Sequence, residues 1–268
     1  MKFSIFGSNG FIGSNMVNFL RNQKIECDEL DPNDEKIFES SLGHVIYCIG
    51  ITADFRERPF ETVEAHVCIL QKILKNCRFD SFLYLSSTRV YLGAISTNET
   101  DQLLVNPNNL DDLYNISKLM GESLCLAMNF KNIRIARLSN VVGNNKNYND
   151  FLSSILHDAI INKKIVLHTK PTSEKDYVHI DDVVKILYKI ALQGKEKIYN
   201  VASGKNTKVI EITNKINNLT NCEVQFTSDA VKQYFSIINI KKIQKEFNFI
   251  PLPFLSRLKE MILSETKN

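Results

Sequence analysis

Three glycines, spaced three residues apart, directly follow the first apolar run of the chain. Lys2 to Phe6 is short, with aromatic and β-branched members, and predicts a buried strand. Phe11 to Leu20 has its apolar residues at helical spacing. The chain therefore begins with a predicted strand, the turn Gly7-Ser8-Asn9-Gly10-Phe11-Ile12-Gly13 and a predicted helix.

A strand, a glycine turn and a helix in this order are typical of sites that bind the pyrophosphate of a dinucleotide. Gly7 would allow a tight turn, Gly10 a close approach to the pyrophosphate, and Gly13 close packing of helix on strand. The N–H groups at the helix N-terminus would face the phosphates. The spacing is GxxGxxG rather than GxGxxG, so a glycine turn without a ligand is the alternative. The predicted cofactor contacts here are Gly7, Asn9, Gly10, Phe11, Ile12 and Gly13.

Beyond this turn, apolar runs that predict strands alternate with stretches that predict helices. The predicted strands are 44–49, 82–85, 133–138, 163–167, 176–180 and 198–201, and the longer predicted helices are 60–77, 113–128, 151–162, 181–192 and 254–264. Such alternation predicts an α/β fold, a doubly wound and mostly parallel sheet with helices on both faces. The rest of the tail is expected to alternate short helices with turns.

Acidic residues crowd the end of a possible second strand, Lys24 to Leu30. An acid at this place commonly binds the ribose 2′-hydroxyl of NAD, and Asp31 is the candidate. No arginine follows that would suit a 2′-phosphate. A solvated acidic turn is the alternative. Gly50, which ends the run 44–49, is a further cofactor-binding candidate.

Ser87, Tyr114 and Lys118 form the most informative set of residues. Tyr114 and Lys118 lie four residues apart on a predicted helix, so they share a face. A nearby ammonium favours the phenolate, so we expect Lys118 to lower the pKa of Tyr114, which could then exchange a proton during hydride transfer. Ser87 ends a predicted strand, where open α/β sheets bind ligands. A surface pair on a helix is the alternative for a lone YxxxK match.

With these motifs, the sequence resembles the extended short-chain dehydrogenase/reductase family, which contains the nucleotide-sugar epimerases, dehydratases and reductases. The resemblance covers nearly the whole chain. The matching stretches are GSNGFIGS (7–14), LSSTRVY (85–91), YNISK (114–118), ARLSNVVG (136–143), KDYVHIDDV (175–183) and YNVASG (199–204).

The resemblance implies an enzyme with a Rossmann-like domain, NAD or NADP as cofactor, a nucleotide-sugar substrate and a homodimer. Carried over by position, Ser87, Tyr114 and Lys118 become the catalytic residues, with Tyr114 and Lys118 also contacting the cofactor. The substrate-binding candidates are Ser87, Thr88, Asn140 and Lys175. We expect a dinucleotide-binding domain at 1–139 with return segments near 176–202, and a small C-terminal substrate-binding lobe from 140–175 and 203–268.

Several positions depart from the pattern of the family. The segment 24–34 is short relative to the strand, helix and strand usual there, His66 stands where an asparagine is usual, and Leu92 replaces a glycine. The 4,6-dehydratases carry an Asp-Glu pair where this chain has Thr88 and Arg89. We therefore expect no dehydratase activity. Because the segment 24–34 is short, fewer residues surround the adenosine half of the cofactor, which favours an exchangeable cofactor and therefore a 4-ketoreductase. The alternatives are a C4 epimerase and a catalytically silent cofactor-binding regulatory protein.

Composition excludes several other classes of protein. With 44% hydrophobic and 24% charged residues the chain can bury a sizeable core. The net charge of +3 is mixed along the chain, so nucleic-acid binding is not expected. No apolar run is long enough for a membrane span, and no signal peptide is expected. The six cysteines lack metal-ligand spacing, which predicts no metal site and a reducing cytoplasm.

Overall fold

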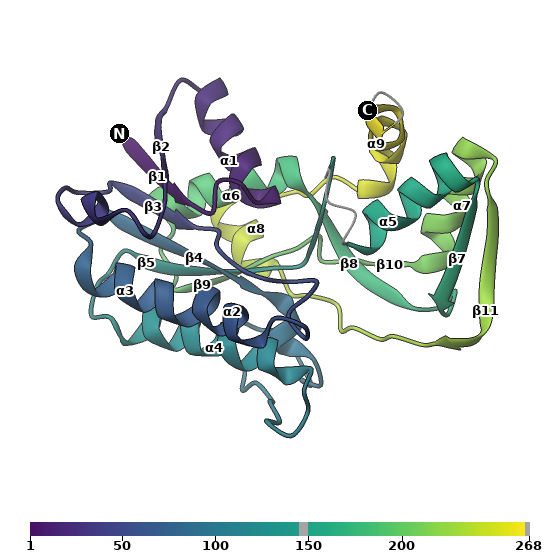
Figure 1. Cartoon of the computed structure of the whole chain (residues 1–268), viewed down its shortest axis with the longest axis horizontal. Coiled ribbons are helices and arrows are strands. Elements are labelled where there is room, and N and C mark those ends of the chain that lie inside the picture. Colours follow the sequence, from purple (N-terminus) through teal and green to yellow (C-terminus); the bar gives the residue numbers. More distant parts are fainter. Residues whose placement is uncertain (145–149, 266–268) are drawn as a thin grey trace.

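The computed structural model describes residues 1–144 and 150–265. Its largest element is a parallel sheet of six strands in the order β2-β1-β3-β4-β5-β9 (Figure 1). In chain order these strands are β1 (Lys2–Phe6), β2 (Glu26–Leu30), β3 (His44–Tyr47), β4 (Ser81–Ser87), β5 (Ile133–Leu138) and β9 (Ile198–Val201). The expected doubly wound, Rossmann-like α/β sheet is confirmed.

Helices cover both faces of this sheet (Figure 1). On one face lie α1 (Phe11–Asn22) and α6 (Ile180–Gln193); on the other lie α2 (Pro59–Val63), α3 (Ile69–Asn76) and α4 (Asp112–Ala127). Successive strand residues point to opposite faces. Phe3 and Ile5 accordingly join the core under α1 and α6, whereas Phe6 joins the core under α3 and α4. Burial on both faces explains why these strands read as continuous apolar runs.

The strand order creates a switch point at β1. This strand pairs with β2 on one side and with β3 on the other, so the chain runs from β1 to β2 in one direction and then crosses back to β3 in the opposite one. Ligands of open α/β sheets bind at such a point, beyond the carboxyl ends of the strands. The turn that starts at Gly7 follows β1, and Gly50 follows β3. Both predicted cofactor turns thus lie at the same edge of the sheet.

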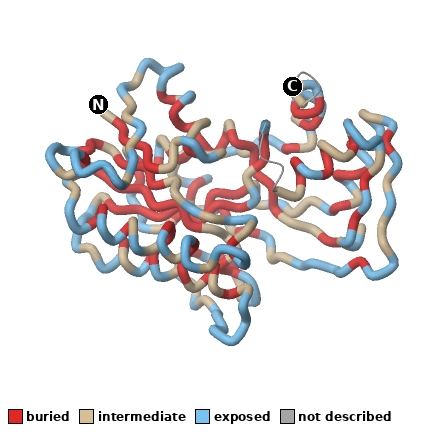
Figure 2. The backbone as a smooth tube through the Cα atoms, in the orientation of Figure 1, coloured by how far each residue is buried: buried red, intermediate tan, exposed pale blue. Residues whose placement is uncertain are grey.

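A smaller lobe packs beside the sheet (Figure 1). It has a three-stranded sheet, β10-β8-β6, and a strand pair, β11-β7. Its elements are β6 (Asn140–Val142), α5 (Phe151–His157), β7 (Lys164–Thr169), β8 (Glu174–His179), β10 (Asn206–Lys208), α7 (Val209–Thr220), β11 (Glu223–Val231) and α9 (Leu258–Glu265). The lobe has its own apolar core, and α8 (Lys241–Phe247) packs against β9 of the main sheet. Figure 2 shows the two buried regions.

Between α1 and β3 the chain forms only β2 and a 3₁₀ turn, Glu35–Phe38, which agrees with the compression expected there. The tail is not only short helices and turns, because Glu223–Val231 forms the strand β11. The domain boundaries stay a prediction. Of the expected return segments near 176–202, α6 and β9 pack in the main sheet region, whereas β8 lies in the lobe. Residues 145–149 and 266–268 of the expected lobe lie outside the described residues.

Candidate active site

Of the three glycines in the first turn, the fold requires Gly7 and Gly13 but not Gly10. Gly7 has a φ of +80°, which side chains disfavour. A Cβ at Gly13 would lie 2.1 Å from the carbonyl oxygen of Gly7, so α1 can pack on the turn only with glycine there. A Cβ at Gly10 would meet only that same oxygen, at 3.4 Å. The protein itself therefore leaves room at Gly10.

This open space fits the pyrophosphate of a dinucleotide. Gly10 is the N-cap of α1 and provides no side-chain hydrogen bond to the first turn. Asn9 and Gly10 are exposed, and Phe11 and Ile12 begin the helix. The N–H groups of an uncapped helix start attract phosphate oxygens. The residues present can thus hold the predicted group.

Asp31 follows directly after β2 at the same edge of the sheet. It is exposed, and its Oδ1 accepts hydrogen bonds from the backbone and side-chain nitrogens of Asn33, at 2.9 and 3.1 Å. Its acidic neighbours are engaged elsewhere: Asp28 pairs with Lys2, and Glu29 with Arg21. Among Asp28, Glu29 and Asp31, Asp31 is therefore the acid without an ion pair to a described residue, and its contact with a ribose stays a prediction.

Lys118 lies buried between the Gly50 turn and the end of β4. Its Nζ donates to the carbonyl oxygen of Leu85 at 3.0 Å, and a Cβ at Gly50 would lie 3.2 Å from the same Nζ. Burial lowers the pKa of Lys118 to about 7, although the carboxylate of Glu122, one helical turn later, acts in the opposite direction. A side chain at Gly50 would thus crowd the ammonium of Lys118 and the ring of His66, which would both have to shift slightly.

Tyr114 and Ser87 meet beside Lys118, on α4 and at the end of β4. Tyr114 is 5% exposed. Its pKa is raised from the ordinary value by burial, and a hydrogen bond with Ser87 and the charge of Arg89 act in the lowering direction. The expected lowering of this pKa by Lys118 is wrong for the structure as it stands, because desolvation of the phenol dominates and the cation that counteracts it is Arg89.

His66 forms hydrogen bonds to both the segment after β3 and the helix α4. It lies in the π-helical turn Glu64–Cys68, is fully buried, and accepts a hydrogen bond from the backbone N–H of Ile51 at Nε2. Its Nδ1 must then carry the proton, which it donates to the hydroxyl of Ser117 at 2.9 Å. Burial and the charge of Lys118 lower the pKa of His66 to about 2, so the ring is neutral.

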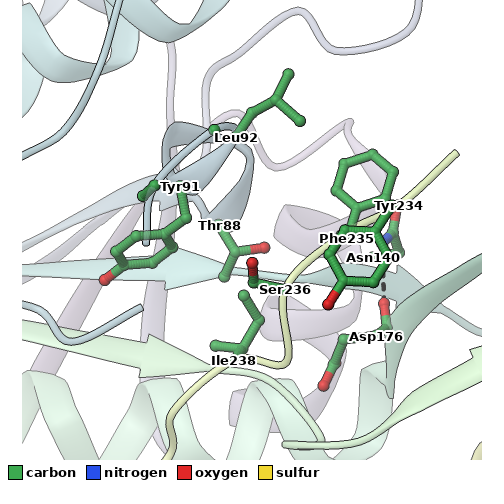
Figure 3. Close-up of a pocket in the computed structure, with 11 residues that line it drawn as sticks. Thr88, Tyr91, Leu92, Asn140, Asp176, Tyr234, Phe235, Ser236 and Ile238 are labelled. Carbon is green, nitrogen blue, oxygen red and sulfur yellow. Dashed lines mark hydrogen bonds between the residues drawn. The ribbon is translucent and has the colours of Figure 1, made fainter. Parts of the chain in front are cut away.

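A cavity of about 220 Å³ opens where the main sheet meets the lobe (Figure 3). Thr88 and Asn140, two of the predicted substrate contacts, line it. Asn140 is held by a hydrogen bond from its Nδ2 to the carbonyl oxygen of Asp176, at 2.8 Å. Lys175, a further predicted substrate contact, is not part of the lining. Its Nζ lies 5.0 Å from the ring centre of Phe235, and Phe235 does line the cavity.

Part of the cavity wall comes from the tail of the chain and was not predicted from the sequence. Tyr234, Phe235 and Ser236 all line the cavity, and Tyr234 and Phe235 lie on the side away from Thr88 (Figure 3). They belong to an irregular segment after β11, so no periodicity marked them. Phe55 was also missed: it is buried, with its ring centre 5.3 Å from that of Tyr114. Its apolar character in a polar loop was the available signal.

No helix in residues 1–144 or 150–265 is long and apolar enough to cross a membrane. Within the same ranges, no group of three or more His, Cys, Asp and Glu side chains is placed to hold a metal ion.

With this fold and edge-of-sheet site, the chain belongs to the NAD-dependent epimerase/dehydratase family, whose model matches residues 4–202. The family comprises enzymes that act on nucleotide sugars as dehydratases, epimerases and reductases. The expected family is therefore confirmed, and its members are oxidoreductases of the short-chain dehydrogenase/reductase type that use NAD or NADP.

Individual relatives of the chain have different activities. A dTDP-4-dehydro-6-deoxy-D-allose reductase from a Streptomyces species is 20% identical over 244 residues, which cover 84% of this chain and 74% of the relative. A dTDP-D-glucose 4,6-dehydratase from Dictyostelium discoideum is 24% identical over 164 residues, 56% of this chain and 38% of that protein.

A solved structure of UDP-glucuronic acid 4-epimerase from Bacillus cereus, in complex with UDP-glucuronic acid and NAD, superposes with a TM-score of 0.80. It is 17% identical and covers 100% of this chain and 99% of its own. At this identity the likeness shows the fold alone.

Proposed function

We propose that this protein is an NAD(P)-dependent 4-ketoreductase of a nucleotide-linked sugar. The observation that supports it is the convergence of Ser87, Tyr114 and Lys118 at the sheet edge that also holds the glycine turn. Thr88 and Asn140 line a neighbouring cavity. Its volume is below the ~300–1,000 Å³ of most small-molecule sites, so it would hold part of a nucleotide sugar, the sugar end.

When bound, the reduced nicotinamide supplies a hydride. Tyr114 donates the phenol proton to the ketone oxygen as the alcohol forms, and its raised pKa keeps that proton in place at neutral pH. Ser87 hydrogen-bonds the same oxygen and orients it. Lys118, in its charged form, stabilises the phenolate that remains. Asn140 and Thr88 hold the sugar in the cavity.

Two features favour a ketoreductase over other members of the family. A 4,6-dehydratase needs carboxylates to move protons, and neither Thr88 nor Arg89 can do so. The adenosine side is bordered by the single edge strand β2 rather than by further strands, which favours release of the cofactor after each turnover. A C4 epimerase remains the second candidate, because the same three residues serve its chemistry. A catalytically silent regulatory protein would have no need for the tyrosine.

The test is turnover of a nucleotide-linked 4-keto-6-deoxy sugar with NADH or NADPH, followed by absorbance of the reduced ring. Tyr114→Phe keeps the ring that packs on Phe55 but lacks the phenolic proton. The turnover rate of this variant should therefore fall by roughly 10²–10⁴-fold, with an unchanged melting temperature. Near-normal turnover in Tyr114→Phe would contradict the assignment. Release of a 4-keto-6-deoxy product from a nucleotide hexose would instead identify a dehydratase.

A further inference from the structure

Two cations near the cavity lack an anionic hydrogen-bond partner among the described residues. Arg89 lies on the 3₁₀ turn Thr88–Tyr91, and its Nη2 is 3.8 Å from Oδ2 of Asp111, too far for a hydrogen bond. Its Nε is buried and has no partner in residues 1–144 and 150–265. Asp111 is already occupied, because Arg56 binds both of its oxygens, at 2.5 and 2.8 Å.

Lys175 is the second of these cations. It is half-buried on β8, and its Nζ lies over the ring of Phe235 with no hydrogen bond or ion pair to any described residue. The pKa of Lys175 is lowered by burial and, next, by the charge of Arg89, so the two cations lie within electrostatic range of each other. They come from different elements, one from the main sheet and one from the lobe.

Both cations adjoin residues that line the cavity, although neither is part of its lining. Arg89 lies between Thr88 and Tyr91, which line the cavity, and Lys175 contacts Phe235, which lines it too. Phe55 positions the guanidinium: its ring centre is 5.5 Å from Cζ of Arg89 and 5.3 Å from the ring centre of Tyr114. Arg89 is therefore held beside the proposed proton donor.

We propose that Arg89 binds an oxyanion of the substrate beside the cavity, near Lys175, whose contact with the substrate the family resemblance already implies, and that Arg89 is a specificity-determining residue. Two partly desolvated like charges repel each other, and an anion between them relieves that cost. A guanidinium also has the fork geometry that carboxylates and phosphates bind. The inference rests on the proposed function, because it takes the substrate to be a nucleotide sugar. The oxyanion is then either the diphosphate or a carboxylate on the sugar.

The experiment measures binding by calorimetry to protein saturated with NAD, so that the glycine turn is filled. The probes are inorganic pyrophosphate, UDP-glucose, dTDP-glucose and UDP-glucuronic acid. The variant is Arg89→Gln, with Arg89→Lys as the conservative one. Arg58→Gln is the matched control, because Arg58 is exposed and pairs with Asp54 and Glu61 at 3.3 and 3.5 Å. Melting curves establish that each variant is folded.

We expect Arg89→Gln to weaken the affected ligand by about 10- to 100-fold, Arg89→Lys to retain part of the affinity, and Arg58→Gln to bind normally. Equal loss for every probe identifies the diphosphate as the partner. Loss confined to UDP-glucuronic acid identifies a sugar carboxylate. If pyrophosphate binds through Arg89 while no nucleotide sugar binds the wild type, the proposed function is wrong and the anion site stands. If no probe's affinity depends on Arg89, the proposal is overturned.

Discussion

At the scale of single residues, the three glycines of the first turn should respond differently to the same added methyl group. Gly10→Ala should leave the melting temperature unchanged, because its Cβ would meet only one backbone oxygen at 3.4 Å. The methyl group would, however, occupy the space proposed for the pyrophosphate, so NAD affinity measured by calorimetry should fall by about tenfold or more. Full NAD affinity in Gly10→Ala would show that the dinucleotide does not approach this turn.

Gly13→Ala is the contrasting variant. Its Cβ would lie 2.1 Å from a backbone oxygen, so the helix or the turn must move. We expect a lower melting temperature even without ligand, which separates a packing glycine from a binding one.

Lys118 gives a residue-level prediction about pH. Burial depresses its pKa from 10.5 to about 7, against the opposing effects of Glu122 and Cys48, and the nearby His66 is neutral at this pH. Between about pH 7 and 10.5 the unfolded chain holds the proton that the folded protein has released. Stability should therefore rise with pH in this window, by at most about 1.4 kcal/mol per pH unit.

Lys118→Met removes this dependence. The difference in free energy of unfolding between wild type and Lys118→Met should grow in favour of the wild type from pH 7 to 9.5, measured by urea titration. The variant should also bind NAD more weakly, as the family resemblance implies a contact with the nicotinamide ribose. A pH-independent difference would mean that Lys118 keeps an ordinary pKa.

At the scale of elements, the acidic end of β2 predicts which dinucleotide is used. Asp31 is exposed there, and the nearby Arg21 is occupied by Glu29 at 2.6 Å. A 2′-phosphate would meet a carboxylate without a free arginine, so KM for NADPH should exceed that for NADH by about tenfold or more. Asp31→Asn should lower the ratio of KM for NADPH to KM for NADH. Asp34→Asn is the control and should leave this ratio unchanged, because Asp34 caps the following 3₁₀ turn. Equal use of both cofactors would contradict this role of Asp31.

The elements also show what the sequence could predict. The six strands of the main sheet and its long helices were visible because burial on both faces demands continuous apolar runs and 3.6-residue periodicity. The same logic placed Ser87 and Gly50 at strand ends. It could not find β6 and β10, which are three residues each, nor the cavity wall at Tyr234 to Ser236, since irregular backbone has no period. The pKa of Tyr114 depends on three-dimensional burial, which spacing alone does not reveal.

At the scale of the whole molecule, the arrangement of sheet and lobe bears on how the cofactor is exchanged. The lobe meets the main sheet beside β4 and β5, where it forms the cavity with Thr88 and Asn140. The opposite end of the sheet terminates at β2, which is partly exposed along its length. The proposed sugar end of the site thus lies between the main sheet and the lobe, whereas the proposed adenosine end is bordered by one edge strand. The homodimer stays a prediction, to be checked by sedimentation against the monomer mass of 30.7 kDa.

This asymmetry separates the two candidate reactions. An epimerase must keep its cofactor while a keto intermediate turns over and takes the hydride back on its other face, whereas a reductase must exchange its cofactor after each hydride. Because the adenosine end is open, we expect protein purified without added dinucleotide to contain well under one equivalent, measured by absorbance and chromatography after denaturation. Added NADH should then be oxidised in stoichiometric amounts with a nucleotide-linked 4-keto sugar. Tightly retained NAD, with interconversion of two nucleotide hexoses and no net oxidation, would assign the epimerase instead.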